Sequence, residues 1–125
     1  MATKGTFIRI VDNTCASYVK CFSIQGKSYA SFLQPGDIIT GSVKYLKTGL
    51  NSQTIKKGVI VKVLIVKIKR NYRRQGNNFI NAVETAGVLI DDQLNPIGTR
   101  INSYVFRELR GLKFFKVISL SKGVL

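Results

Sequence analysis

The sequence predicts a mainly β protein, a small five-stranded β-barrel with a protruding β-ribbon and one or two short C-terminal helices. Segments rich in Val, Ile, Phe and Tyr recur between residues 7 and 90, and turn residues separate them. After residue 103 the apolar spacing lengthens to three to five, which is typical of a helix. The 125 residues, 45% of them hydrophobic, suit one domain with its own core. We expect that single domain to span 1–125, with the barrel at about 1–98 and the helical segment at about 99–125.

The strand-like segments follow one another with short interruptions. They are expected at residues 7–11, 18–24, 38–46, 59–69, 79–83 and 86–90. Turns are indicated at Asp12-Asn13, at Gln34-Pro35-Gly36-Asp37 and across 91–96. The segment 59–69 alternates apolar side chains on both of its faces, which is typical of a central strand.

Two further elements complete the prediction. Residues 70–78 are polar and basic and contain Gly76, which favours the tip of an extended hairpin, the ribbon. Tyr104, Val105, Phe106 and Leu109 have the spacing of a short helix over 104–110, with Gly111 as its C-terminal stop. Residues 114–120 fit either another helical turn or a strand.

The charge balance indicates a polyanionic partner. Lys and Arg number 20 against 6 for Asp and Glu, a formal net charge of +14. No acid occurs between Asp37 and Glu84, whereas this interval holds ten cations. From it we take these candidate nucleic-acid contacts: Lys44, Lys56, Lys57, Lys67, Lys69, Arg70, Arg73 and Arg74. Lys provides a point charge for phosphate and Arg a two-pronged contact, although a solvated surface is the alternative. Tyr72 either stacks on an unpaired base or ribose or packs on its neighbours.

A second basic group lies in the tail. Arg100, Arg107 and Arg110 are close in sequence, and Arg107 and Arg110, three residues apart, would share a helical face. They form either another anionic contact or, with Glu108, the solvated side of an amphipathic helix.

Catalytic and metal chemistry are disfavoured. The chain has no His, and it lacks the Gly-rich phosphate-binding motifs. Cys15 and Cys21 are six residues apart, in neither a C-x-x-C nor a zinc pattern, so we expect reduced, partly buried thiols, with a disulfide as the alternative. The Asp91-Asp92 pair lies in a turn, where capping is the expected role. We therefore predict no enzyme, no cofactor and no metal.

A membrane partner is also disfavoured. The longest apolar-leaning run, 59–68, is interrupted by Lys62 and Lys67. It falls far short of the roughly 20 apolar residues that a spanning helix needs.

A set of short segments occurs in an order that identifies a family resemblance. The set comprises Val11-Asp12-Asn13-Thr14, Gly36-Asp37-Ile38-Ile39, Lys56-Lys57-Gly58, the strand from Val63 to Val66 with Lys69-Arg70 and Arg73-Arg74 after it, Asn95-Pro96-Ile97-Gly98-Thr99-Arg100, Arg107-Glu108-Leu109-Arg110, Lys116-Val117-Ile118-Ser119-Leu120 and Val124-Leu125. Together these segments resemble the universal family of large-subunit ribosomal protein fourteen over nearly the whole chain.

The resemblance implies a five-stranded barrel with a ribbon and C-terminal helices. It implies binding to large-subunit rRNA near the subunit interface, contact with small-subunit rRNA in an intersubunit bridge, and packing on neighbouring ribosomal proteins. Thr99, Arg100 and Lys116 match the family's surface for the ribosome-silencing factor. We add Arg107, Arg110 and Lys113 to this expected partner surface.

The chain departs from the bacterial pattern at several positions. Cys15-Ala16-Ser17 stands where that pattern has Gly-Ala-Arg, Gly76-Asn77 where it has Asp-Gly, and Ala82 where it has an aromatic residue. Abundant Ile, Asn and Lys suit an AT-rich organellar gene. These features favour a mitochondrial ribosome, with a plastid or the bacterial cytoplasm as alternatives.

Two other function classes compete with a ribosomal role. A free-standing single-strand-binding or chaperone-like barrel would show several aromatic residues along exposed strand faces. A protein–protein adaptor held by Phe114 and Phe115 would associate without salt dependence, although these side chains also suit tail packing.

Overall fold

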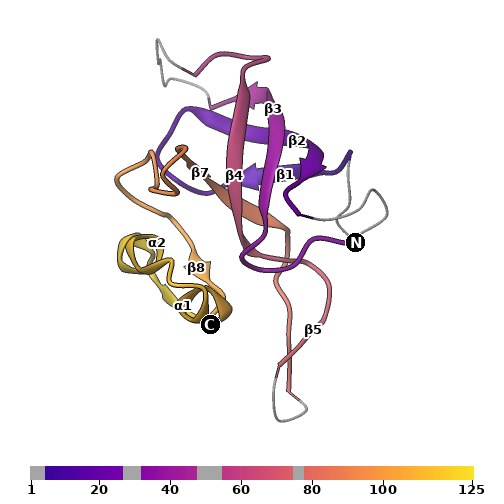
Figure 1. Cartoon of the computed structure of the whole chain (residues 1–125), viewed down its shortest axis with the longest axis vertical. Helices are drawn as coiled ribbons and strands as arrows, with labels where there is room; N and C mark the ends of the chain where they lie inside the picture. Colours follow the sequence, from indigo (N-terminus) through magenta and orange to yellow (C-terminus); the bar gives the residue numbers. More distant parts are fainter. Residues whose placement is uncertain (1–4, 27–31, 48–54, 75–77) are drawn as a thin grey trace.

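The computed structural model describes residues 5–26, 32–47, 55–74 and 78–125 and contains a closed five-stranded barrel (Figure 1). Its strands are β1 (Phe7–Ile10), β2 (Ala16–Ile24), β3 (Ile38–Leu46), β4 (Ile60–Lys67) and β7 (Ala86–Ile90), neighbours in that order. Neighbouring strands are antiparallel except at the closure, where β1 pairs parallel with β7. A ring with an odd number of strands needs one such parallel pair. The predicted fold class is confirmed.

Strand β4 separates the two apolar cores of the molecule. Val63 and Ile65 point into the barrel, whereas Leu64 and Val66 belong to a second cluster on the outside, and all four are fully buried. The strand is therefore apolar on both faces, as its sequence predicts. The second cluster joins the outside of β4 and β7 to the C-terminal segment.

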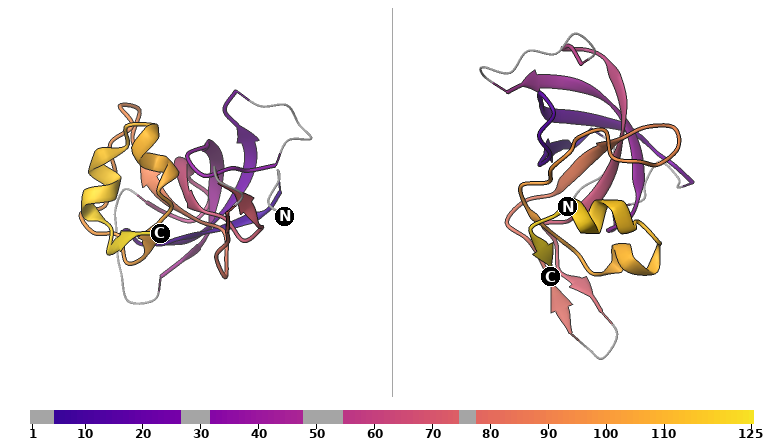
Figure 2. Two further views of the ribbon diagram at one scale, coloured as in Figure 1. Left: turned by 90° about the horizontal axis from the view of Figure 1, so that it is seen from below. Right: turned by 90° about the vertical axis from the view of Figure 1, so that its left-hand side faces the viewer.

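The C-terminal segment packs along one side of the barrel (Figure 2). It consists of β8 (Tyr104–Val105), α1 (Glu108–Gly111), α2 (Phe115–Leu120) and β9 (Gly123–Val124). Phe106 is fully buried in the barrel's own core cluster, and its backbone N–H donates to the carbonyl of Val66 at 2.9 Å. Phe106 thereby anchors the segment to the barrel.

The expected helix over 104–110 is wrong in its first half. Tyr104 and Val105 form β8, which pairs parallel with β9, and α1 begins only at Glu108. Gly111 is the last residue of α1, while Lys113 adopts the left-handed conformation with φ at 66°. The undecided segment 114–120 is helical over α2. No helix within the described ranges has the length and apolar character needed to cross a membrane.

The ribbon consists of β5 (Tyr72–Arg73) and β6 (Phe79–Ile80), which are antiparallel and project beyond the end of β4 (Figure 1). The strand expected at 79–83 is thus shorter than predicted. The expected turn at Gly76-Asn77 lies outside the described residues. At the base of the ribbon, Ala82 packs against the barrel core.

Candidate nucleic-acid interface

Each of the six carboxylates has a polar partner within the protein. Among the described residues, ion pairs join Arg9 to Glu84 at 3.0 Å, Lys62 to Asp92 at 3.1 Å and Arg74 to Glu108 at 2.5 Å. The others accept backbone N–H groups: Asp12 from Leu89, Asp37 from Gln34, and Asp91 from Gln93 and Asn95. The capping role expected in the 91–96 turn is confirmed for Asp91. These acids fix the fold, and the surplus of cations remains for other contacts.

The candidate RNA-binding residues divide between two ends of the barrel. Lys67 ends β4 half-buried, and the exposed Lys69 follows it toward the ribbon. Half-buried Lys44 and the exposed pair Lys56 and Lys57 lie at the other end of the β3–β4 hairpin. The eight residues of β4, at about 3.3 Å each, separate these groups by roughly 25 Å. The two groups therefore form separate cationic regions.

Two candidates at the base of the ribbon are partly engaged in packing. The guanidinium of Arg70 lies over the ring of Phe32, 5.6 Å from its centroid. Tyr72 is half-buried against the barrel core and opposite Ile80 in the ribbon. Of the two alternatives for Tyr72, packing on its neighbours describes this arrangement.

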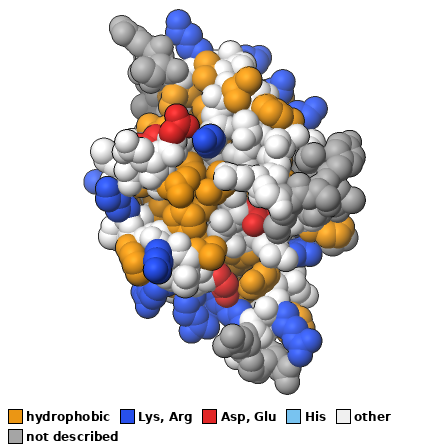
Figure 3. Space-filling view, in the orientation of Figure 1, with side chains coloured by type: hydrophobic (Ala, Val, Ile, Leu, Met, Phe, Trp, Pro, Cys, Tyr) orange, Lys and Arg blue, Asp and Glu red, His pale blue; other side chains and the backbone are white. Residues whose placement is uncertain are grey.

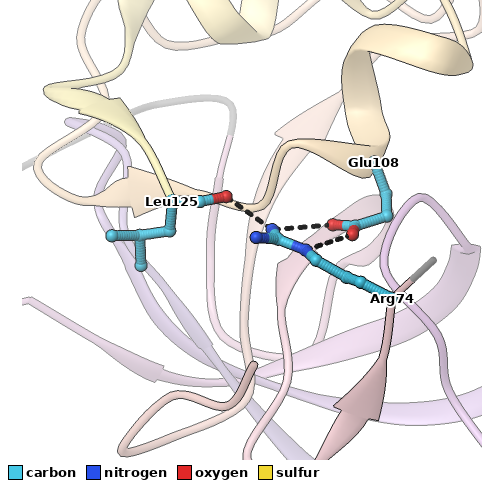
Figure 4. Close-up of polar contacts among 3 residues, drawn as sticks. All are labelled: Arg74, Glu108 and Leu125. Atoms are coloured by element: carbon cyan, nitrogen blue, oxygen red, sulfur yellow. Dashed lines mark hydrogen bonds and ion pairs between the residues drawn. The ribbon is translucent and has the colours of Figure 1, made fainter. Parts of the chain in front are cut away.

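Arg74 ties the ribbon to the C-terminal segment (Figure 4). Its Nε donates to Glu108 Oε1 at 2.5 Å and its Nη2 to Oε2 at 3.2 Å, and Nη2 also reaches the main-chain oxygen of Leu125. The guanidinium lies 5.8 Å from the centroid of Phe106, and the Arg74 side chain is only 12% exposed. The sequence groups Arg74 with the RNA contacts, but these bonds give it a structural role.

A hollow of about 610 Å³ lies where the ribbon meets the start of α1. This ribbon hollow is lined by Tyr72, Arg73, Arg74, Arg107, Glu108 and Gly111. Arg73 and Arg107 are exposed, and they come from segments more than thirty residues apart. Figure 3 shows Lys and Arg side chains gathered over the C-terminal segment and beside the ribbon. The fold thus assembles a cationic, partly aromatic hollow from two of the basic stretches seen in the sequence.

The remaining partner residues lie apart from this hollow. Thr99 and Lys116 line a second hollow of about 320 Å³. Asn13 fixes Thr99, because its Oδ1 accepts the Thr99 N–H at 2.9 Å and its Nδ2 donates to Thr99 Oγ1 at 2.7 Å. Arg100 follows on the exposed side of the chain. The structure therefore brings Thr99 and Lys116 together and places Arg107 with the ribbon.

Two other expected partner residues occupy different surroundings. Lys113 and Lys116 line an apolar hollow of about 540 Å³ together with Leu94 and Phe115. Arg110 is exposed in the last turn of α1. Lys116 lines both hollows and so links Lys113 to Thr99, whereas Arg107 lies at the ribbon hollow.

A family model described as ribosomal protein L14p/L23e matches residues 1–125, the whole chain. The chain belongs to this family. Membership makes it a structural constituent of the large ribosomal subunit, in a class without enzymatic activity, and fits a location at the ribosome. The family resemblance in the sequence is confirmed.

The barrel of this L14-family protein carries a group of exposed aromatic residues that was not predicted from the sequence. Phe7, Tyr18 and Tyr45 come from three different strands and meet through strand pairing. Alternation gave the available signal, because the exposed Phe7 precedes the buried Ile8 in β1 and the exposed Tyr18 precedes the buried Val19 in β2. Cys15 and Cys21, by contrast, are thiols without a disulfide, as expected, and both are buried rather than partly buried.

Proposed function

We propose that this L14-family chain binds large-subunit rRNA near the subunit interface and contributes to an intersubunit bridge. The observation that carries the proposal is the ribbon hollow, where Arg73 and Arg107 face a shared space of about 610 Å³. The acid at this site, Glu108, is already neutralised by Arg74. Arg73 and Arg107 therefore present positive charge to a phosphate group beside an acid that is already paired.

The chemistry of the hollow suits the RNA backbone rather than base edges. An arginine fork donates two parallel hydrogen bonds to a phosphate, and such contacts fix position without reading sequence. Lys67 and Lys69 extend the cationic path from the barrel toward the ribbon. Lys44, Lys56 and Lys57, roughly 25 Å away along β4, would hold a separate stretch of RNA. The ribbon, which projects from the barrel, is the element suited to reach small-subunit rRNA.

The test removes the two exposed arginines of the ribbon hollow, Arg73 and Arg107, and leaves the bonds of Arg74 in place. In the full chain, we expect the double variant Arg73→Gln/Arg107→Gln to bind deproteinised large-subunit rRNA with a shallower salt dependence. The slope of log K against log [salt] should fall by about 0.7–0.9 for each phosphate that the variant no longer neutralises. The matched control is Lys62→Gln, which removes a cation paired with Asp92 and should leave the slope unchanged. An unchanged slope in the double variant would contradict the assignment of the hollow.

The bridge is tested separately. Large subunits assembled with the same double variant should associate with small subunits more weakly, as measured by light scattering over a magnesium titration. If the subunits associate normally although rRNA binding is reduced, the bridge proposal is contradicted and the proposal of an rRNA contact stands.

We also propose that Thr99, Arg100 and Lys116 form a surface for protein partners, neighbouring ribosomal proteins or a ribosome-silencing factor. Thr99 and Lys116 line one hollow, and Asn13 holds the Thr99 hydroxyl in place. Lys116→Glu should abolish retention of the factor on purified large subunits, whereas the exposed Lys122→Glu should not. Equal retention on both variants would exclude Lys116 from the contact.

The proposed compartment is the mitochondrion, supported by the abundance of Ile, Asn and Lys and by the departures from the bacterial pattern. Sedimentation of fractionated organelles through a sucrose gradient tests it. The chain should follow the mitochondrial large subunit through high-salt washes. Recovery with plastid or bacterial ribosomes would replace this assignment, and a soluble pool outside the subunit peak would favour an off-ribosome barrel.

A further inference from the structure

Three aromatic side chains form a continuous exposed surface on the outside of the barrel. Phe7 on β1, Tyr18 on β2 and Tyr45 on β3 are 48%, 36% and 56% exposed. The ring of Tyr45 lies 6.2 Å from Phe7, tilted by 45°, and 6.2 Å from Tyr18, edge to face. We call these three residues the aromatic face.

The aromatic face borders a hollow of about 450 Å³ that Ser17 also lines. Such an exposed group of rings is unfavourable in water and is a recognised mark of an interaction site. On the other side of the barrel, the outside of β4 and β7 is covered by apolar residues of the C-terminal segment. The protein thus buries one outer sheet face within itself and leaves aromatic rings accessible on the other.

Cations frame the rings on the same three strands. Lys20 is paired directly with Phe7, and Arg9 with Tyr18, in the β1–β2 register. Lys44 is the extra residue of the bulge between Val43 and Tyr45 on β3, and Arg9 forms an ion pair with Glu84 at 3.0 Å. Rings alternating with ammonium and guanidinium groups suit a partner with flat apolar surfaces joined by negative charges. An unpaired RNA strand has that pattern, with a phosphate between successive bases.

We propose that the aromatic face stacks unpaired bases of an RNA strand. Tyr45 and Phe7, the most exposed of the three rings, offer the stacking surfaces, and Lys20 and Lys44 hold the adjoining phosphates. The proposal rests on the proposed function in that the partner is RNA. It concerns a different surface, since no residue of the ribbon hollow belongs to this face.

The experiment separates stacking from charge. The full-length double variant Tyr18→Leu/Tyr45→Leu keeps apolar bulk and every cation but removes two rings. The probes are a 12-nucleotide oligouridine and an abasic strand with the same number of phosphates. We expect the variant to bind oligouridine at least about fivefold more weakly, the effect expected when one stacked base is given up, and to bind the abasic strand as the unchanged protein does. The salt slope should not change for either strand.

Two controls keep the result interpretable. Tyr104→Leu removes a tyrosine that is 50% exposed on β8, away from this face, and should leave both affinities unchanged. Tyr18→Phe/Tyr45→Phe keeps the rings and should bind oligouridine normally.

Because the chain has five Tyr and no Trp, quenching of its tyrosine fluorescence by oligouridine reports stacking directly. Oligouridine should quench a smaller fraction of the tyrosine fluorescence in the leucine variant than in the unchanged protein. The reason is that the two tyrosines removed are the ones expected to stack.

The outcomes distinguish the two proposals. Equal weakening for oligouridine and the abasic strand, or no weakening for either, would overturn the stacking proposal while rRNA binding stands. If neither strand binds more weakly, a protein partner is the better occupant of the aromatic face. If the unchanged protein binds neither probe nor deproteinised large-subunit rRNA, the proposed function itself fails.

Discussion

Asp12 joins the turn after β1 to the strand that closes the barrel. Its side chain is almost completely buried, with 1% of the residue exposed. Oδ2 accepts the N–H of Leu89 in β7 at 3.1 Å, and Oδ1 accepts the N–H of Thr14 at 3.1 Å and its hydroxyl. One carboxylate therefore satisfies donors from two segments far apart in the sequence, a use that the Asp12-Asn13 turn signal alone does not reveal.

We expect Asp12→Ala to lower the free energy of unfolding by about 2–3 kcal/mol, because the buried N–H of Leu89 loses its acceptor. Asp12→Asn should cost less, since the amide oxygen still accepts one of these hydrogen bonds. Urea unfolding monitored by circular dichroism measures both variants. The control is Asp92→Ala, which breaks an exposed ion pair and should change stability by less than about 1 kcal/mol. Equal effects at Asp12 and Asp92 would contradict this role.

At the scale of elements, the ribbon and the C-terminal segment are held together by Arg74 and Glu108. We expect Arg74→Lys to destabilise the protein by about 1–2 kcal/mol, because an ammonium cannot reproduce the two-pronged contact or the packing on Phe106. The salt slope of rRNA binding should stay unchanged. Arg73→Gln should do the opposite, lowering the slope with little effect on stability. Thermal unfolding measures the stability of the two variants, and salt titration of rRNA binding measures their salt slopes.

Most strands could be predicted from the local sequence pattern, whereas several contacts between distant segments could not. Expected and observed bounds agree at β3, and the two-sided alternation of β4 correctly indicated a strand between two apolar layers. The strand β8 was missed because its partner β9 lies almost twenty residues further along the chain. The aromatic face needed the pairing of three strands, and the bond from Arg74 to Glu108 joins residues 34 apart. Periodicity reports on a residue's own element, so contacts between distant elements stay hidden.

For the whole molecule, the net charge of +14 sets how stability responds to salt. The six acids are already engaged within the fold, and those in the ion pairs of the described residues are Glu84, Asp92 and Glu108, so most cations repel one another across a compact surface. Screening weakens that repulsion, because the Debye length falls from about 30 Å at 0.01 M salt to about 10 Å at 0.1 M. The same screening weakens the ion pairs, but exposed pairs contribute only about 0–1 kcal/mol each.

The repulsion therefore dominates, and we expect the Tm to rise by a few degrees between 10 mM and 100 mM NaCl, about 1 kcal/mol of added stability for a domain of this size. Scanning calorimetry at fixed pH measures it. A variant with Lys56, Lys57 and Lys69 changed to Gln, all three exposed, removes repelling charges without breaking an ion pair. Its Tm should be higher in low salt and should rise less with added NaCl. A Tm that falls with salt in the unchanged protein would mean that the three ion pairs outweigh the surplus charge. In that case the cations would not need a polyanion to offset their repulsion, and the charge would no longer support RNA as the partner.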